Sequence, residues 1–158
     1  MQEQQLTFIK EGMFTLLENF SPDSTRNWGK MNAQQMVEHV TDFFDVSTEK
    51  IKFPLTTPEE HLPKYRAFLY SDKVFKENTK APAEVLGEDP LPLRHADLKT
   101  ALNKLKISVA DFFIYFENDP NRLTQHPAFG LLNFDEWIIL HYKHVSHHFR
   151  QFGLMPAA

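Results

Sequence analysis

Four segments of the chain repeat their hydrophobic residues with the period of an α-helix. They cover about residues 4–20, 32–51, 97–118 and 133–153. In the third segment, apolar residues alternate at four- and three-residue spacing, which is typical of a bundle helix. No segment shows the sustained two-residue alternation of a half-buried strand. The pattern therefore predicts an all-α protein.

Two of the predicted helices begin with a capping signal. Asn32 is followed three positions later by Gln35, and Asn133 is followed in the same way by Glu136. Both pairs fit a capping box, in which side chains bond the free backbone N–H groups at a helix start. Gly153 is a residue type that commonly ends a helix, and it follows the last segment.

A long connection, residues 52–94, separates the second and third helical segments. It holds six of the ten prolines and only short helical pieces, such as residues 63–69. A connection of this length is unusual unless it crosses a bundle, and a crossing would let the helices on either side run parallel. We therefore expect a four-helix bundle with a long crossover between helices two and three.

The last predicted helix carries four histidines in eight residues. With Trp137 at zero and about 100° per residue, His141 lies near 40°, His144 near 340° and His148 near 20°. Apolar residues occupy a nearby arc from about 60° to 100°; they are Phe134, Ile138, Val145 and Phe152. The imidazoles therefore point toward the core. A buried polar ring without a partner costs on the order of 1–3 kcal/mol, and a bound metal ion would explain such a cluster.

Composition and charge exclude several classes of protein. The length fits a single domain spanning residues 1–158. The net charge is −4 and no basic run is present, so we expect no nucleic-acid partner. The N-terminus lacks a secretion signal and no apolar run could span a bilayer, which favours a cytoplasmic protein without a membrane partner. Cysteine is absent, so metal ligands must be nitrogen or oxygen and a reactive thiol would come from outside.

Two histidines of the last helix have the spacing of a metal-binding pair. His144 and His148 lie one helical turn apart, where two imidazoles can grip one ion. The glutamate of the metalloprotease motif H-E-x-x-H is missing between them, so peptidase activity of that kind is not expected. His39, on the apolar side of the second helix, is the candidate third ligand. Its alternative role is a core histidine bonded to a backbone carbonyl.

Other polar residues leave more than one role open. Asp42, one turn after His39, could orient a ligand by accepting its second ring N–H, or it could be a solvated surface carboxylate. His141 could be a fourth ligand, an acid or base in a pocket, or a packed core residue. His147 projects about 80° from the histidine stripe and would be a surface group or a support for a ligand. His126, in the stretch HPAFG, is expected to form a turn or to fold over the open end of the bundle.

Three stretches of the sequence resemble the DinB/YfiT-like metalloenzyme superfamily, and more narrowly an uncharacterised bacterial branch of it. They are WGKMNAQQMVEHV, HPAFGLLNFDEW and HYKHVSHHFRQFG, and the likeness covers essentially the whole chain. The most specific part is the pattern H-x-x-H-H-x-x-Q in the last helix, here His144, His147, His148 and Gln151. Arg150 stands where many relatives have glycine, which affects the expected pocket shape but not the metal.

This resemblance implies a fold, a metal and a class of activity. The fold would be an up-down-down-up four-helix bundle. The metal would be zinc or nickel, held by one histidine of the second helix and two of the last, which correspond to His39, His144 and His148. Gln151 would line the pocket or support a ligand. Members of the superfamily include thiol-dependent S-transferases and isomerases that use bacillithiol, mycothiol or glutathione.

The sequence leads to three hypotheses. The first is a metal-dependent enzyme, either a thiol-dependent S-transferase or a hydrolase, that acts on a small electrophilic substrate through an open coordination position. The second is a non-catalytic metal-binding or stress-associated bundle, with a homodimer as one option. The third is a bundle whose histidines pack in the core without any ion.

Overall fold

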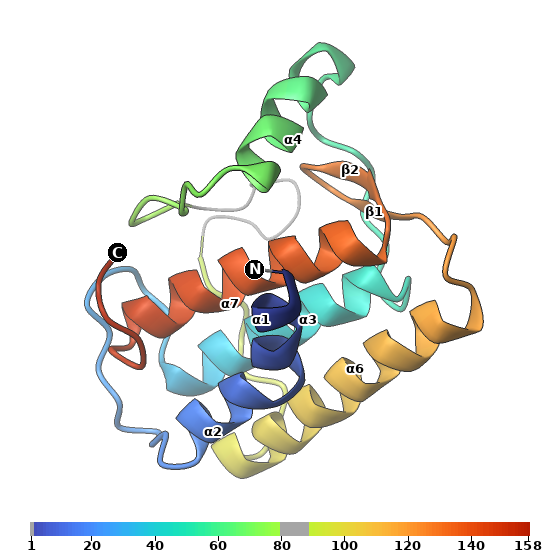
Figure 1. The fold of residues 1–158 in the computed structure, drawn as a ribbon. Helices are drawn as coiled ribbons and strands as arrows, with labels where there is room; N and C mark the ends of the chain where they lie inside the picture. The colour runs from blue at the N-terminus through green and yellow to red at the C-terminus, as the bar shows by residue number, and fades with distance from the viewer. Residues whose placement is uncertain (1, 80–88) are drawn as a thin grey trace.

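In a computed structural model, which describes residues 2–79 and 89–158, the chain is mostly helical with one small antiparallel sheet. The longest helices lie side by side and enclose the core (Figure 1); they are α3 (Ala33–Ser47), α6 (Leu98–Asn118) and α7 (Phe134–Gln151). Within the described residues, no helix is both long and apolar enough to cross a membrane. The mostly helical character predicted from periodicity is confirmed.

The first predicted helix, residues 4–20, is interrupted in the structure. It consists of three successive pieces: α1 (Gln2–Thr7), a π-helical turn (Phe8–Gly12) and α2 (Met13–Leu17). Its buried apolar residues recur every four positions at Ile9, Met13 and Leu17. Because this spacing keeps them on one side, the segment covers the core formed by the longer helices.

The predicted capping boxes are confirmed at both helix starts. The side chain of Asn32 accepts from the backbone N–H of Gln35, and the side chain of Gln35 accepts from the backbone N–H of Asn32. Asn133 and Glu136 make the same reciprocal pair at the start of α7. The second helix ends at Ser47 rather than near residue 51, since the chain turns through Glu49 with a φ of 63°.

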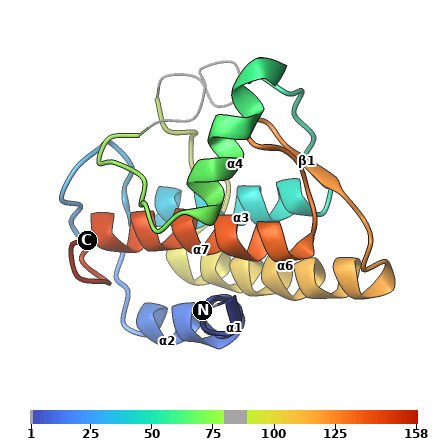
Figure 2. The same cartoon turned by 45° about the horizontal axis from the view of Figure 1, so that its top comes forward.

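The connection between α3 and α6 contains α4 (Leu62–Tyr70), which confirms the helical piece predicted at residues 63–69. Both views place α4 on the side of α7 that faces away from α6 (Figures 1 and 2). Arg66 and Tyr70 of α4 donate hydrogen bonds to the carboxylate of Glu136, which joins α4 to the start of α7. Residues 80–88 of the connection lie outside the described residues, and with them Pro82, one of the six prolines of this segment.

A short hairpin was not predicted from the sequence. Strand β1 (Thr124–His126) pairs antiparallel with β2 (Gly130–Leu132), and Gly130 takes a φ of 80°. Three-residue strands are too short to show an alternating pattern, so the all-α prediction overlooked them. Trp137 Nε1 donates to Thr124 Oγ1, which in turn donates to the carbonyl of Ser47. These bonds fix the hairpin between α3 and α7.

Candidate metal centre

Three histidines converge between α3 and α7. His39 comes from α3, while His144 and His148 lie one turn apart on α7, and one nitrogen of each lies within 4.8 Å of the others. The Nε2 atoms of His39 and His144 are 2.9 Å apart. The rings stand edge to face with centroids 4.8–4.9 Å apart. The structure thus brings together the three residues that the sequence singled out, in an arrangement compatible with a metal site.

The spacing of the nitrogens fits one shared cation. Bonds of about 2.0–2.1 Å to a tetrahedral zinc ion put any two ligand nitrogens about 3.4 Å apart. The observed separations begin at 2.9 Å for the closest pair and do not exceed 4.8 Å for any pair. The spacing that a zinc ion requires lies inside this range. The donor set of three nitrogens suits a borderline ion such as zinc or nickel.

Burial keeps all three rings in the form that binds metals. Desolvation, with smaller contributions from His147 and Arg94, lowers the pKa of His39 to about 4. Burial also lowers the pKa of His144 and of His148 well below the usual value, and the neighbouring histidines add to the effect. At neutral pH the imidazoles are therefore uncharged, so each ring keeps one nitrogen lone pair and a cation would not compete with a second proton on the ring.

A hydrogen-bond chain fixes the orientation of His148. Its Nδ1 lies 2.8 Å from Gln151 Oε1, which can only accept, so Nδ1 carries the proton and Nε2 keeps its lone pair. Gln151 Nε2 donates in turn to the carbonyl of Trp28 at 2.9 Å. Gly29 takes a φ of 81°, which favours glycine, and a Cβ there would lie 2.6 Å from Gln151 Nε2 and displace this amide. This is the type of contact that orients histidine ligands in metal sites.

The histidine cluster lines a cavity of about 1220 Å³. Its wall is formed by α3, α4, α7, the hairpin and parts of the loops around residues 28–31, 73–79 and 89–94. Aromatic rings make up much of this wall, among them Trp28, Phe43, Tyr65, Phe68 and Phe75. A space of this size can hold a small organic molecule next to the three imidazoles.

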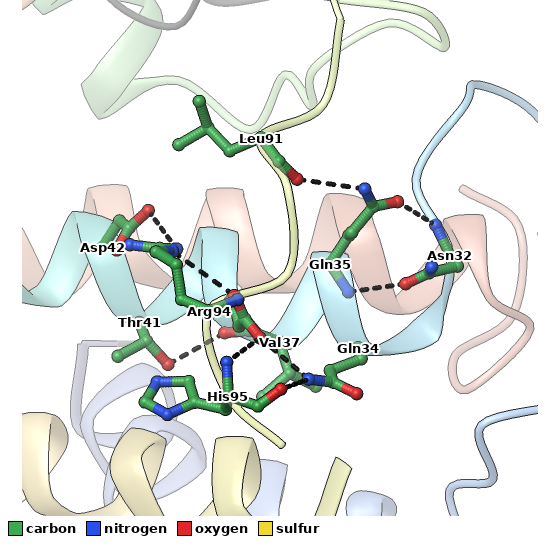
Figure 3. A network of polar contacts seen from close by, with 10 residues as sticks. Asn32, Gln34, Gln35, Val37, Thr41, Asp42, Leu91, Arg94 and His95 are labelled. Carbon is green, nitrogen blue, oxygen red and sulfur yellow. Dashed lines mark hydrogen bonds and ion pairs between the residues drawn. The ribbon is translucent and has the colours of Figure 1, made fainter. Parts of the chain in front are cut away.

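Asp42 lines the cavity, but within the described residues it neither accepts from a clustered histidine nor lies at the surface. It is buried, and both of its oxygens accept from the guanidinium of Arg94, at 2.9 and 2.8 Å (Figure 3). Glu38 accepts from the backbone N–H groups of Arg94 and His95 and from the amide of Gln34. This network could not be predicted from the sequence, because Arg94 lies 52 positions from Asp42 in a segment without periodicity.

His141 packs in the core and is not part of the three-nitrogen cluster. It is 1% exposed, stacks on Phe44 at 3.9 Å and on Trp137 at 5.1 Å, and its Nε2 lies 3.1 Å from Ser47 Oγ. The hydroxyl of Ser47 donates to the carbonyl of Phe44, so Nε2 of His141 is the donor to Ser47. Of the alternatives for this residue, the packed core histidine agrees with the structure.

His147 is not a surface residue. Only 4% of it is exposed, and its ring lies between Trp28 and Phe75, with centroid distances of 5.5 and 5.8 Å. It also contacts His148, at 5.1 Å between centroids, and lines the cavity. The surface alternative is therefore wrong, because the loops before α3 and after α4 cover this side of α7. The contact with His148 agrees with the other predicted role of His147, a support for a ligand.

Comparison with known proteins identifies the family of this chain. A family model described as "Protein of unknown function (DUF1569)" matches residues 12–155, which include all three clustered histidines. The chain therefore belongs to the DUF1569 family. No curated protein and no solved structure matches it.

Proposed function

We propose that this member of the DUF1569 family is a metal-dependent enzyme, either a thiol-dependent S-transferase or a hydrolase, that acts on a small electrophilic substrate. One observation carries the proposal: three uncharged imidazoles meet at the wall of a cavity large enough for a small molecule. Structural zinc sites use four protein ligands, whereas catalytic sites use three and leave a position for water or substrate. Within the described residues the cluster has three histidine ligands, the number found in catalytic sites.

Different residues of the chain would have different roles in such a site. His39, His144 and His148 would hold a zinc or nickel ion, which when bound supplies Lewis-acid chemistry that lowers the pKa of water or of a thiol. Gln151 keeps Nε2 of His148 directed at the cluster. The aromatic wall would bind the apolar part of a substrate and exclude water. Because the chain has no cysteine, the thiol of a transferase reaction would be a separate small molecule.

For the fold we propose the DinB/YfiT-like arrangement, an up-down-down-up four-helix bundle in which α1 and α2 together form the first helix. Figure 1 supports it, since α3 and α6 run in one direction and α7 runs in the other. The long connection that carries α4 is the kind of crossover that parallel neighbouring helices require.

Metal analysis followed by a screen for turnover tests the function. Protein purified without a histidine tag should contain about one equivalent of zinc or nickel per chain, as expected for one three-histidine site. His144→Ala should lose the metal, whereas His61→Ala, at an exposed histidine of the connection, should keep it. The metal-loaded protein is then incubated with fluorogenic electrophiles, with and without a panel of cellular thiols. Turnover that disappears in His144→Ala supports the enzyme.

The other outcomes select the competing hypotheses. Bound metal without turnover across a broad panel would favour the non-catalytic metal-binding protein. Absence of metal would favour packed histidines without an ion. The 2.9 Å contact between His39 Nε2 and His144 Nε2 supports this last alternative, because the two rings are close enough to share one proton in a hydrogen bond.

A further inference from the structure

A second feature of the cavity wall is a histidine whose tautomer is set by the backbone. His126 ends strand β1, and its Nδ1 accepts from the backbone N–H groups of Ala128, at 2.9 Å, and Phe129, at 3.2 Å. A ring nitrogen that accepts cannot carry the proton, so a neutral imidazole here has its proton on Nε2. Burial lowers the pKa of His126 to about 3, which keeps the ring neutral at physiological pH.

The Nε2–H of His126 has no hydrogen-bond partner among the residues of the 2–79 and 89–158 ranges. The ring is held among Phe43, Phe129 and Trp137, with centroid distances of 5.5, 5.2 and 5.7 Å, yet it is partly exposed and lines the cavity. The ring of Phe43 also contacts His39 and His144, at 5.3 and 5.1 Å. His126 therefore shares one wall with the histidine cluster.

Formation of the hairpin turn explains the role of only one ring nitrogen of His126, Nδ1. The turn requires an acceptor for two backbone N–H groups, a task for which Asn and Asp are the common residues. Those side chains are short, whereas imidazole adds a second nitrogen that extends beyond the turn. Next to the aromatic rings of Phe43, Phe129 and Trp137, a fixed N–H group provides a directed donor, which is how ligand pockets set the orientation of what they bind.

We propose that His126 Nε2–H donates a hydrogen bond to a carbonyl-type oxygen of the molecule bound in the cavity. This inference rests on the proposed function and adds to it a chemical requirement, namely a substrate or thiol cosubstrate with an acceptor oxygen. His126 would act as a donor that positions the ligand. It cannot act as a general base, because Nε2 already carries a proton and Nδ1 is occupied by backbone N–H groups.

Simple thiols test this inference on the zinc-loaded protein. The probes are linear thiols of increasing length that end in a primary amide, each compared with a methyl-ended thiol of the same length. An uncharged amide is used because a carboxylate would also respond to Lys64 and Lys73 in the cavity wall. At the length that reaches His126, calorimetry should show about tenfold tighter binding of the amide thiol, the effect of one hydrogen bond.

The variant His126→Asn should remove this preference. Asparagine keeps an oxygen that can accept from the backbone N–H of Ala128, so the turn, the unfolding temperature and the zinc affinity should stay close to those of the wild type. The methyl-ended thiols should bind both proteins equally well. If the wild type does not bind zinc, the proposed function fails first and independently of His126.

Several results would overturn the inference. They are an amide preference that persists in His126→Asn, its absence at every probe length in the wild type, and loss of zinc binding in the variant, which would show a purely structural role. NMR of ¹⁵N-labelled wild-type protein gives a reading without any variant or probe. It should show the proton of His126 on Nε2 at neutral pH, and a proton on Nδ1 would exclude the proposed donor.

Discussion

At the scale of the residue, the partner of one ring nitrogen decides what the other nitrogen can do. Gln151 holds Nδ1–H of His148 and leaves Nε2 free to bind a cation. Ser47 takes the Nε2–H of His141, and that ring is thereby removed from the candidate chemistry. Helical phase alone could not separate these two histidines, because both point inward by their spacing. Their partners lie on other elements, and periodicity within one helix carries no information about them.

Replacing Gln151 by leucine should weaken zinc binding by about 10- to 100-fold, because His148 loses the acceptor that fixes its tautomer and orientation. Competition with a chromophoric chelator measures the affinity. Gln4→Leu is the matched control, since Gln4 is exposed and makes no side-chain hydrogen bond within the described part of the chain. Equal zinc affinities for the two variants would show that the contact between Gln151 and His148 has no influence on the site.

His141 should make the protein sensitive to acid. Burial, with a contribution from His126, holds the pKa of His141 well below its usual value in the folded state. Below about pH 6.5 the unfolded chain therefore binds a proton that the folded chain does not, and stability falls as pH falls, by up to about 1.4 kcal/mol per pH unit for this residue.

His141→Phe separates this effect from packing. The variant keeps a ring between Phe44 and Trp137 but cannot be protonated. At neutral pH it should be less stable by about 1 kcal/mol, the value of the lost bond to Ser47. Urea unfolding at several pH values should then show a shallower loss of stability below about pH 6.5 than in the wild type. If the stabilities of His141→Phe and the wild type fall equally with pH, protonation of His141 does not contribute to the acid sensitivity.

At the scale of the element, the sequence predicted best what neighbouring residues determine. Asn32 and Asn133 begin their helices as expected, because a capping box involves residues only three positions apart. The hairpin of β1 and β2 was overlooked, since bonds from Trp137 and Thr124 to distant segments hold it. For the same reason, the position of α4 over the cavity could not be read from its own sequence.

The segment after α4 is joined to α7 by a buried lysine. Lys143 Nζ donates to the carbonyls of Ser71, at 2.8 Å, and Lys73, and lies 4.8 Å from the centre of the Phe68 ring. Lys143→Met would keep the apolar stem but remove both bonds. We expect hydrogen exchange at residues 71–79 to become roughly 30-fold faster, for a loss of about 2 kcal/mol of local stability.

Mass spectrometry of exchange in peptides can locate this effect. Peptides from α7 itself should exchange at the wild-type rate. Lys106→Met, at an exposed position of α6, is the control for removing a lysine and should leave residues 71–79 unchanged. Unaltered exchange at residues 71–79 in Lys143→Met would show that other contacts hold this part of the cavity wall.

At the scale of the whole molecule, two sets of contacts surround the cavity. The histidine cluster joins α3 to α7, whereas Arg94 joins the end of the long connection to Asp42 of α3 (Figure 3). Burial would raise the pKa of Glu38, but the hydrogen bonds from Gln34 and from the backbone at Arg94 and His95 outweigh it and lower that pKa. Burial raises the pKa of Asp42, although the guanidinium of Arg94 opposes this shift. The connection is therefore held by two carboxylates of opposite pKa shift, and the hydrogen bonds to Glu38 favour its ionised form.

The two sets of contacts should respond separately to mutation. Arg94→Met leaves the buried carboxylate of Asp42 without its guanidinium. Breaking a fully buried pair costs 3–5 kcal/mol, but the Arg94 side chain is 46% exposed, so water can replace part of the interaction and we expect a loss of about 2 kcal/mol. Lys30→Met breaks the exposed pair with Asp89 and should change stability by less than about 0.5 kcal/mol.

Zinc affinity is the measurement that distinguishes the two sets. His39 keeps its place on α3 and faces α7 whether or not the connection is anchored, so Arg94→Met should bind zinc as tightly as the wild type while unfolding at lower urea concentration. A parallel loss of zinc affinity and stability would show that the connection determines the spacing of α3 and α7. The histidines would then be brought together by the whole wall of the cavity, and not by the packing of two helices alone.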